Sequence, residues 1–339
     1  MRRLFLAGVL IVSLTFSLHL IRSQNRGAPD FPQMQISSQT REVTIEIPPG
    51  STGSDIAALL FTSGVVKSSS AFFRVAVGDS RSAKIAPGAH RLSLEISAQQ
   101  ALDQLLDSKR MPDLFVVTEG AWNSEILAEL RSRGFTKMEI DSAIKSVKLP
   151  SGFSSLEGVL FPAQYSFPKR ATASEILQAM ISRFTTEATR SGLQSGGGKF
   201  TPQQLLTIAS IIQAEGDLKD FTKVSRVIRN RLDISMPLQL DSTVHYIRKV
   251  RGQVFLSTQA TLAKSPYNTY RNYGLPPGPI GNPGRAAIDA AMHPEAGDWL
   301  FFITVAPGDT RFTKSNDEFL NWKRLYEKNR RAGAFEVKK

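Results

Sequence analysis

The residue with the clearest chemical potential is Glu215, a carboxylate at the end of a predicted helix. Thr201 supplies an N-cap hydroxyl, Pro202 takes the first helical position and Gln204 the third, which is a typical helix start. Gly216 follows Glu215 at once, where a helix commonly ends in a left-handed turn. One apolar stripe leads up to this carboxylate at helical spacing, formed by Leu205, Ile208, Ala209 and Ile212.

This position predicts a raised pKa for the Glu215 carboxyl. The negative end of the helix dipole and partial burial both disfavour the charged form. A carboxyl that keeps its proton near neutral pH can act as a general acid. The alternative is a solvated glutamate in the last turn of an amphipathic helix. Position alone favours that alternative, because most carboxylates in such positions are structural.

Two motifs that follow one another around Glu215 favour the functional interpretation of this glutamate over the structural one. The first runs through residues 208–215 (IASIIQAE), 226–232 (RVIRNRL) and 236–244 (MPLQLDSTV). The second comprises residues 265–271 (SPYNTYR) and 274–284 (GLPPGPIGNPG). Together they resemble the YceG-like family (MltG type) of membrane-anchored endolytic murein transglycosylases. The resemblance covers roughly residues 42–325 and is specific between residues 205 and 283.

Further polar residues of these motifs are candidate substrate contacts. Gln239 and Asp241 alternate with leucines, which predicts a short extended segment with its polar positions on one side. An ordinary strand with one solvated side would show the same alternation. In a loop rich in proline and glycine, polar side chains are usually present for a contact or a turn. The predicted substrate-binding residues are Gln239, Asp241, Thr243, Asn268, Tyr270 and Asn282.

The resemblance implies a lytic transglycosylase reaction, which needs only one carboxylic acid. Glu215 would protonate the glycosidic oxygen between MurNAc and GlcNAc, and would then take the proton of the sugar's own C6 hydroxyl. A 1,6-anhydro ring closes without water, so neither a metal nor an organic cofactor is expected. Gln239, Asn268 and Tyr270 would orient the N-acetyl group and the departing sugar. Asp241 leaves a hydrolytic muramidase open, because hydrolytic glycosidases typically use two carboxylates.

The chain departs from the family pattern at several places. Ala163 and Gln164 stand where Asp-Thr is usual, although Glu157 of the same element matches. Glu157 could line the cleft, but we expect it to bind a backbone amide. Phe319 follows Glu318 where a histidine is common, so no histidine role carries over. Gln213 replaces a second glutamate, which leaves Glu215 as the expected acid.

Residues 1–26 are predicted to be a membrane anchor. Arg2 and Arg3 precede an apolar run at residues 4–21, about 18 residues and just long enough to span a bilayer. No small-residue cleavage site follows, which favours an uncleaved single span over a signal peptide. The arginines favour a cytoplasmic N-terminus. We therefore expect the bacterial inner membrane, with the C-terminal bulk on the periplasmic side and residues 27–41 as a polar tether.

Residues 42–150 are predicted to hold a weak internal repeat, shifted by 70 positions. In each copy an apolar strand, at residues 43–47 and 114–117, leads through a turn into a helix. A partial third copy lies between them, at residues 85–88 and in the helix 98–106. These units resemble the LysM-like region of the family, which suggests glycan binding; a spacer between membrane and active site is the equal alternative. The matched pairs are Gly50/Gly120, Ile56/Ile126, Leu60/Leu130 and Gly64/Gly134.

Residues 151–339 are predicted to form the catalytic domain, entered through a hinge at residues 156–168. Helices are expected over residues 173–189, 220–232 and 282–292, a strand over 299–305, and a last helix after Phe312. The proline-dense run 276–283 is expected to be a rigid cleft wall. The predicted fold class is α+β: an N-terminal transmembrane helix, small LysM-like strand–helix modules, then a mixed α/β catalytic domain.

The amino-acid composition limits which binding partners are expected. The net charge of +12 suits an acidic partner, but the basic residues are scattered and no nucleic-acid-binding motif is present. Peptidoglycan stem peptides and anionic lipid head groups fit this charge as well as nucleic acid does, and no nucleic acid is expected. The lack of cysteine excludes thiol catalysis and disulfides. The expected partners are peptidoglycan glycan strands, the bilayer through residues 4–21 and, by the resemblance, peptidoglycan synthases. A non-catalytic peptidoglycan-binding scaffold remains the other function class.

Overall fold

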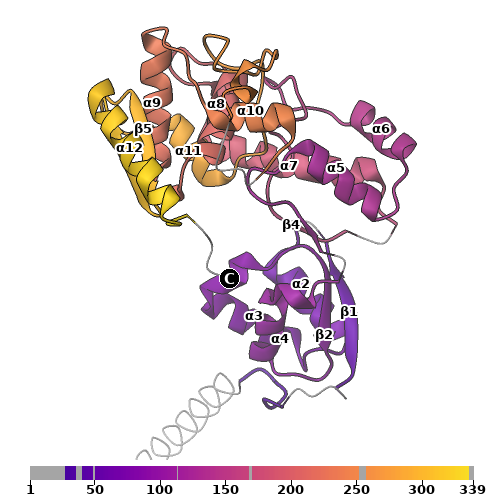
Figure 1. The fold of residues 1–339 in the computed structure, drawn as a ribbon. Coiled ribbons are helices and arrows are strands. Elements are labelled where there is room, and N and C mark those ends of the chain that lie inside the picture. Colours follow the sequence, from indigo (N-terminus) through magenta and orange to yellow (C-terminus); the bar gives the residue numbers. More distant parts are fainter. Residues whose placement is uncertain are drawn as a thin grey trace, which may run out of the picture. The chain divides into compact units, whose positions relative to one another are not determined.

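The computed structural model describes residues 27–35, 40–48, 50–112, 114–167, 170–251 and 257–335. They form two compact units (Figure 1). The first unit takes the described residues up to Phe115 together with Gln164–Arg170, and the second takes Val116–Ala163 and those from Ala171 on. Among the described residues, no helix is both long and apolar enough to cross a membrane. The predicted anchor at residues 4–21 lies outside them.

The first unit has the element order strand, helix, helix, strand, helix. Its two strands pair in antiparallel fashion, from Glu42 opposite Ser93 to Ile47 opposite Gly88. Hydroxyls of Thr52 and Ser97 cap two of the helices in reciprocal capping boxes, which is why those helices begin where they do. The elements are β1 (Glu42–Ile47), α2 (Gly53–Thr62), α3 (Ser69–Gly78), β2 (Gly88–Ser93) and α4 (Ala98–Leu106), with 3-10 turns at Ser80–Lys84 and Ser108–Arg110.

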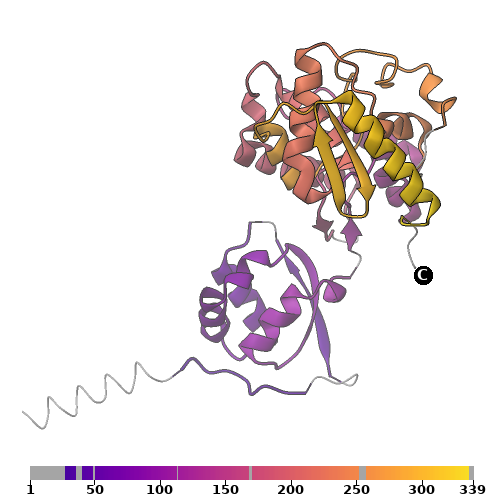
Figure 2. The same ribbon diagram turned by 60° about the vertical axis from the view of Figure 1, so that its left-hand side comes forward.

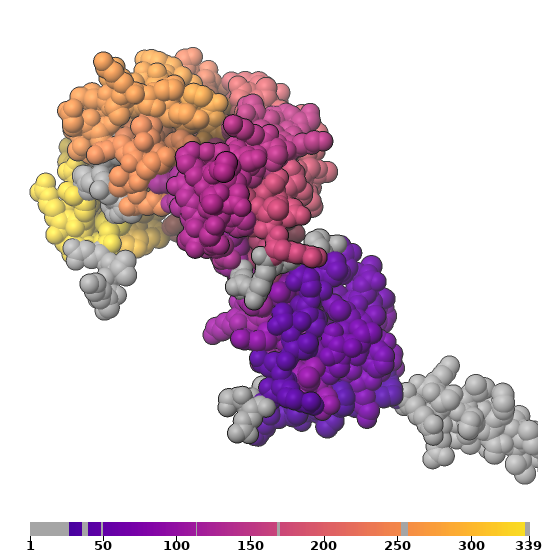
Figure 3. Space-filling view, turned by 90° about the vertical axis from the view of Figure 1, so that its right-hand side faces the viewer, coloured from indigo at the N-terminus to yellow at the C-terminus, as the bar shows by residue number. Residues whose placement is uncertain are grey.

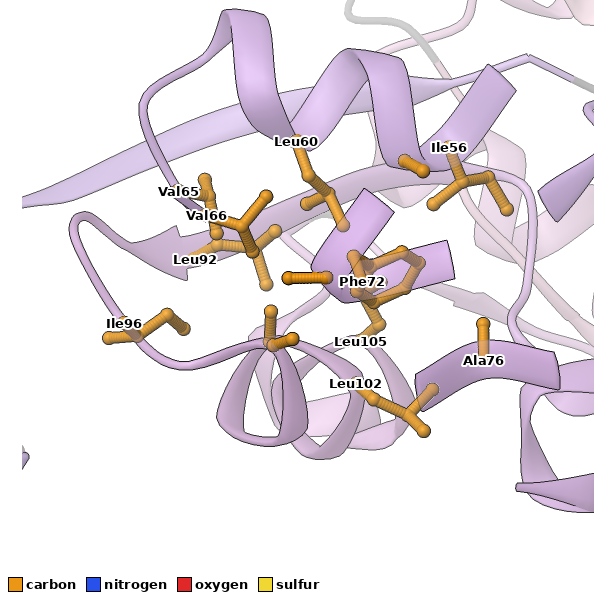
Figure 4. Close-up of a cluster of buried hydrophobic side chains, with 14 of the residues drawn as sticks. Ile56, Leu60, Val65, Val66, Phe72, Ala76, Leu92, Ile96, Leu102 and Leu105 are labelled. Atoms are coloured by element: carbon orange, nitrogen blue, oxygen red, sulfur yellow. The ribbon is translucent and has the colours of Figure 1, made fainter. Parts of the chain in front are cut away.

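A single apolar core holds this unit together. Phe72 of α3 is fully buried and lies among side chains from α2, α4 and β2, as the close-up in Figure 4 shows. Burial of large side chains is the main stabilising contribution in so small a unit. The labelled core residues are Ile56, Leu60, Val65, Val66, Phe72, Ala76, Leu92, Ile96, Leu102 and Leu105.

The second unit is mostly helical. Its only two-stranded hairpin among the described residues is β5–β6, and α12 packs along it (Figure 2). Two short strands, β3 (Phe115–Val116) and β4 (Gln164–Tyr165), pair with each other, and β4 and Phe115 belong to the first unit. The helices and hairpin strands are α5 (Asn123–Ser132), α6 (Lys137–Ser146), α7 (Ala173–Ser191), α8 (Pro202–Glu215), α9 (Phe221–Asp233), α10 (Asp241–Arg248), α11 (Arg285–Met292), β5 (Phe301–Ala306), β6 (Asp309–Thr313) and α12 (Asn316–Arg331), with 3-10 turns at Leu193–Ser195, Leu218–Asp220 and Ala260–Leu262.

Helix α8 is the centre of the second unit. It packs against α9, α10 and α11, and every residue from Leu205 to Ile212 is buried. A helix buried all round must satisfy its polar side chains internally. The Ser210 hydroxyl does so by donating to the Thr207 carbonyl at 2.7 Å and accepting the Ile280 N–H at 3.0 Å. The capping box predicted between Thr201 and Gln204 is confirmed.

The structure bears out a mixed α and β composition and revises several details of it. Residues 116–150 belong to the second unit, not with the predicted N-terminal repeat region. The helices of the two repeat copies, α2 and α5, therefore lie in different units. All four repeated glycines have positive φ (82°, 73°, 76° and 98°), which explains why glycine recurs there. Strand β6 was missed, and Asn282-Pro283 precede the N-cap of α11, which is Gly284.

Replacing Phe72 with alanine should lower the free energy of unfolding of the first unit by about 3–5 kcal/mol, because a large buried ring is lost from a packed core. The matched control is Phe73→Ala at the next position, where 42% of the residue is exposed; its effect should stay within about 1 kcal/mol. Urea denaturation of both variants measures the difference. Equal losses would contradict this description of the core.

Candidate active site

Glu215 is the last residue of α8, as predicted, and it is partly buried. The expected left-handed turn at Gly216 is wrong: this glycine is extended, with φ −120° and ψ 157°. A side chain there would lie 3.2 Å from Phe221 and 3.3 Å from Val224 of α9. A larger residue would need Phe221 and Val224 to shift by a few tenths of an ångström, so glycine suits the close approach of α9 beside Glu215.

The Glu215 carboxylate meets the start of another helix. Its Oε1 accepts the main-chain N–H of Ser242 at 3.1 Å, and Ser242 is the second residue of α10. The first amides of a helix have no partner within it and carry the positive end of its dipole. The carboxyl thus lies between the C-terminal end of its own helix and the N-terminal end of α10.

Burial is the largest influence on this carboxyl and raises its pKa, as the sequence predicted. The negative charge of Asp241 raises it further. Ser242 and the positive charge of Arg231 act in the opposite direction. The net result is a raised pKa, so the arrangement favours a protonated acid that can still become charged.

Asp241 and Tyr270 form a pair beside Glu215. The Tyr270 hydroxyl donates to Asp241 Oδ1. Burial, together with Asp241, raises the pKa of Tyr270, so the phenol keeps its proton. The structure therefore brings three of the predicted site residues together: Glu215, Asp241 and Tyr270.

Gln239 is exposed near this group but does not lie in an extended strand. Its φ is +46°, and its N–H donates to the Thr269 carbonyl at 3.1 Å. The chain bends at Gln239 and starts α10 at Asp241, so the predicted extended segment is wrong. The alternation of apolar and polar residues arose because Leu238 and Leu240 are buried on either side of this bend.

The other three predicted contacts have buried side chains. Thr243 donates to the Leu240 carbonyl at 2.7 Å. The Asn268 amide donates to the carbonyls of Thr261 and Ala263, at 2.9 and 2.8 Å. A substrate contact by Thr243, Asn268 or Asn282 stays a prediction, whereas their hydrogen bonds within the chain explain why these polar residues are present.

Asn282 joins three segments of the second unit. Its Oδ1 accepts the Leu160 N–H at 2.8 Å, and its Nδ2 donates to the Ala121 carbonyl and to Asn123 Oδ1, both at 2.8 Å. Next to it, a side chain on Gly281 would lie 2.8 Å from the Gly120 carbonyl oxygen.

The proline-dense run 276–283 contains no helix or strand, as expected, and most of it is buried. Figure 3 shows one face of this unit, where atoms of the α5–α6 region (magenta) and of the later loops (orange) both reach the surface.

Two further glutamate-related predictions have clear outcomes. Glu157 accepts the Asn123 N–H and the Tyr246 hydroxyl, each at 3.0 Å, so its expected bond to a backbone amide is confirmed. Gln213 accepts the Gly284 N–H at 2.9 Å through its side-chain oxygen. An amide at Gln213 therefore ties α8 to the start of α11.

In the described part of the chain, no group of three or more acidic or histidine side chains could hold a metal ion.

Sequence reasoning missed Arg231 and Ser242. Arg231 is buried and donates to the carbonyls of Leu238 and Leu300, at 2.5 and 2.6 Å, which holds the segment before α10. Both residues stand inside the quoted motifs, but their roles depend on a helix start at Asp241. Reading residues 238–241 as an extended segment concealed that start.

The matches to known proteins cover the residues of the candidate site. The model of the YceG-like family matches residues 45–324. The chain is 33% identical over 307 residues to a Bacillus subtilis (strain 168) protein named endolytic murein transglycosylase, covering 84% of each. It is 26% identical to the protein of that name from Streptococcus pneumoniae serotype 2 (strain D39), covering 83% of this chain and 58% of that longer protein. A crystal structure of a yceG-like protein from Listeria monocytogenes is similar with a TM-score of 0.53 and 28% identity, covering 83% of this chain and 98% of that one.

The raised pKa makes a prediction about stability. A carboxyl whose pKa is higher in the folded chain than its ordinary 4.5 stabilises the fold below that pH, and this contribution is lost as pH rises through the folded value. Glu215→Gln should therefore be more stable than the wild type at about pH 7, and the gain should vanish by about pH 4. Denaturation at both pH values measures it.

Asp217→Asn, at an exposed carboxylate two residues further on, is the control and should show no such gain. A Glu215→Gln variant that is no more stable than the wild type at neutral pH would contradict the assigned environment.

Proposed function

Because the chain belongs to the YceG-like family, we propose that it is an endolytic murein transglycosylase with Glu215 as its general acid and base. The observation that carries this proposal is the partly buried Glu215 carboxyl, which lies at the end of α8 and accepts the Ser242 N–H at the start of α10. The names of the Bacillus and Streptococcus relatives support the same reaction. The substrate is then the glycan strand of peptidoglycan.

In the first step, protonated Glu215 donates its proton to the oxygen that links MurNAc to GlcNAc. The bond between C1 of MurNAc and this oxygen breaks, and the sugar develops oxocarbenium character. A raised pKa supports this role, because the carboxyl still holds its proton near neutral pH.

In the second step, the same carboxylate takes the proton from the C6 hydroxyl of the MurNAc residue. The C6 oxygen bonds to C1 and closes the 1,6-anhydro ring, so Glu215 is protonated again and no water is consumed. The Ser242 N–H supports this cycle because it stabilises the charged form between the two steps. A positioned acid or base of this kind contributes about 10²–10⁴ in rate.

The neighbouring polar groups are proposed to orient the glycan. Tyr270 and Asp241 form a hydrogen-bonded pair next to Glu215, and Gln239 is exposed at the bend before α10. We assign these three to direct substrate contact. Thr243, Asn268 and Asn282 would support the substrate indirectly, through the loops that their side chains hold.

A hydrolytic muramidase is the second candidate, and Asp241 is the observation that favours it. Its charge acts on Glu215, so two carboxylates are close enough to influence each other. Against a hydrolytic role, one oxygen of Asp241 already accepts the Tyr270 hydroxyl, which lowers its availability as a nucleophile or base.

The remaining parts of the proposal concern location. We propose that residues 4–21 anchor the chain in the bacterial inner membrane and that the two units lie on the periplasmic side, where peptidoglycan is found. Peptidoglycan synthases would be partners there. The first unit would bind glycan or act as a spacer, and binding of that unit to purified sacculi separates the two.

Glu215→Gln should lower the release of glycans with 1,6-anhydro ends from purified sacculi by about 10²-fold or more, because the amide cannot deliver the proton. Mass spectrometry of the released ends measures this. A wild type that binds sacculi but releases nothing would instead indicate a non-catalytic scaffold.

Asp241→Asn separates the two enzymes. A transglycosylase should still form only anhydro ends, with a rate loss of at most about a hundredfold, the value of one hydrogen bond to a charged group. Complete loss of cutting in this variant, or hydrated reducing ends from the wild type, would favour the muramidase.

A further inference from the structure

The hydroxyl of Ser242 is a buried polar group without a hydrogen bond. Only 8% of the residue is exposed, and its Oγ has no hydrogen-bond partner within the described part of the chain. Buried side-chain hydroxyls are normally paired, because an unpaired one loses its interaction with water without replacement. An unpaired hydroxyl beside a candidate catalytic acid therefore calls for an explanation.

The position of Ser242 gives that explanation. Its main-chain N–H already donates to Glu215 Oε1 at 3.1 Å, so the hydroxyl lies on the residue that contacts the carboxyl. The Ser242 side chain lowers the pKa of the Glu215 carboxyl, although its hydroxyl does not meet hydrogen-bond geometry with any group in the described part of the chain. A serine hydroxyl can rotate and donate in several directions without any movement of the backbone.

The other polar groups that face Glu215 are engaged elsewhere. Arg231 on α9 donates to the carbonyls of Leu238 and Leu300. Tyr270 donates to Asp241, whose negative charge opposes that of Glu215. Among these groups, the Ser242 hydroxyl is the donor that makes no other hydrogen bond.

We propose that the Ser242 hydroxyl is a switchable second donor to Glu215: it turns to the carboxylate after the proton has left and turns away when the proton returns. Ser242 is a positioning residue, because it acts on the carboxylate and does not contact the sugar. The inference rests on the proposed function for its role in turnover. The carboxylate would accept two hydrogen bonds from one residue, its N–H and its O–H. Together they would lower the energy of the charged form that exists between proton donation and ring closure.

The test is a titration of the Glu215 carboxyl in the full chain. Infrared difference spectra detect the stretch of the protonated carboxyl, which is assigned by its absence in Glu215→Gln. In Ser242→Ala the titration should move to higher pH by about one to two units, the equivalent of one lost hydrogen bond to a charged group. Ser242→Thr keeps the hydroxyl and should titrate like the wild type.

Ser225→Ala is the matched control, because Ser225 of α9 is also buried and its hydroxyl also lacks a partner in the described part of the chain. Its Glu215 titration should not move. An unmoved titration in Ser242→Ala, or the same shift in Ser225→Ala, would overturn the proposal. This readout is independent of turnover, so a wild type that forms no anhydro ends would refute the proposed function while the titration still decides the role of Ser242.

Kinetics supply the second readout. Ser242→Ala should lower kcat about 10–100-fold with little change in KM, because the lost hydrogen bond forms only once charge develops on Glu215. The fall of activity at high pH should also move upward, since Glu215 must be protonated to act. A change confined to KM would overturn the assignment and place Ser242 in substrate binding.

Discussion

One constraint shapes the second unit. The Glu215 carboxyl must be buried enough to keep its proton near neutral pH, and its charged form must still be stabilised after the proton has left. Burial alone would make the charged form of Glu215 very costly. The end of α8 meets the start of α10, so a main-chain amide with no partner inside its own helix donates to the carboxyl. The opposed effects of burial and of this helix start leave Glu215 with a raised pKa and an accessible charged state.

The rest of the unit keeps this junction in place. Helix α8 is buried along its middle, so its last residue is fixed by the packing of α9, α10 and α11. The close contact at Gly216 turns the chain into α9, and Arg231 of α9 reaches back to the segment that leads into α10. Asn282 joins the loop before α11 to residues near positions 121 and 160. Residues far apart in the sequence thus position one carboxyl.

The parts that local sequence determines could be predicted. The cap at Thr201, the length of α8 and the raised pKa of Glu215 follow from neighbouring residues and helix geometry. The start of α10 could not be recognised, because Leu238 and Leu240 alternate with polar residues as they would in a strand. Their burial comes from contacts distant in sequence, and the positive φ of Gln239 ends the apparent alternation. Gly216 was misjudged for a similar reason, since the chain is extended there and the close neighbours are side chains of α9.

The central claim is that one side chain both gives a proton to the glycan and takes one from it, with no water in the reaction. Digestion of purified sacculi in water enriched in ¹⁸O, followed by mass spectrometry of the released glycans, tests this most directly. The account predicts that the new ends carry no ¹⁸O. One ¹⁸O atom at each new end would show that water attacks the sugar, and would contradict it.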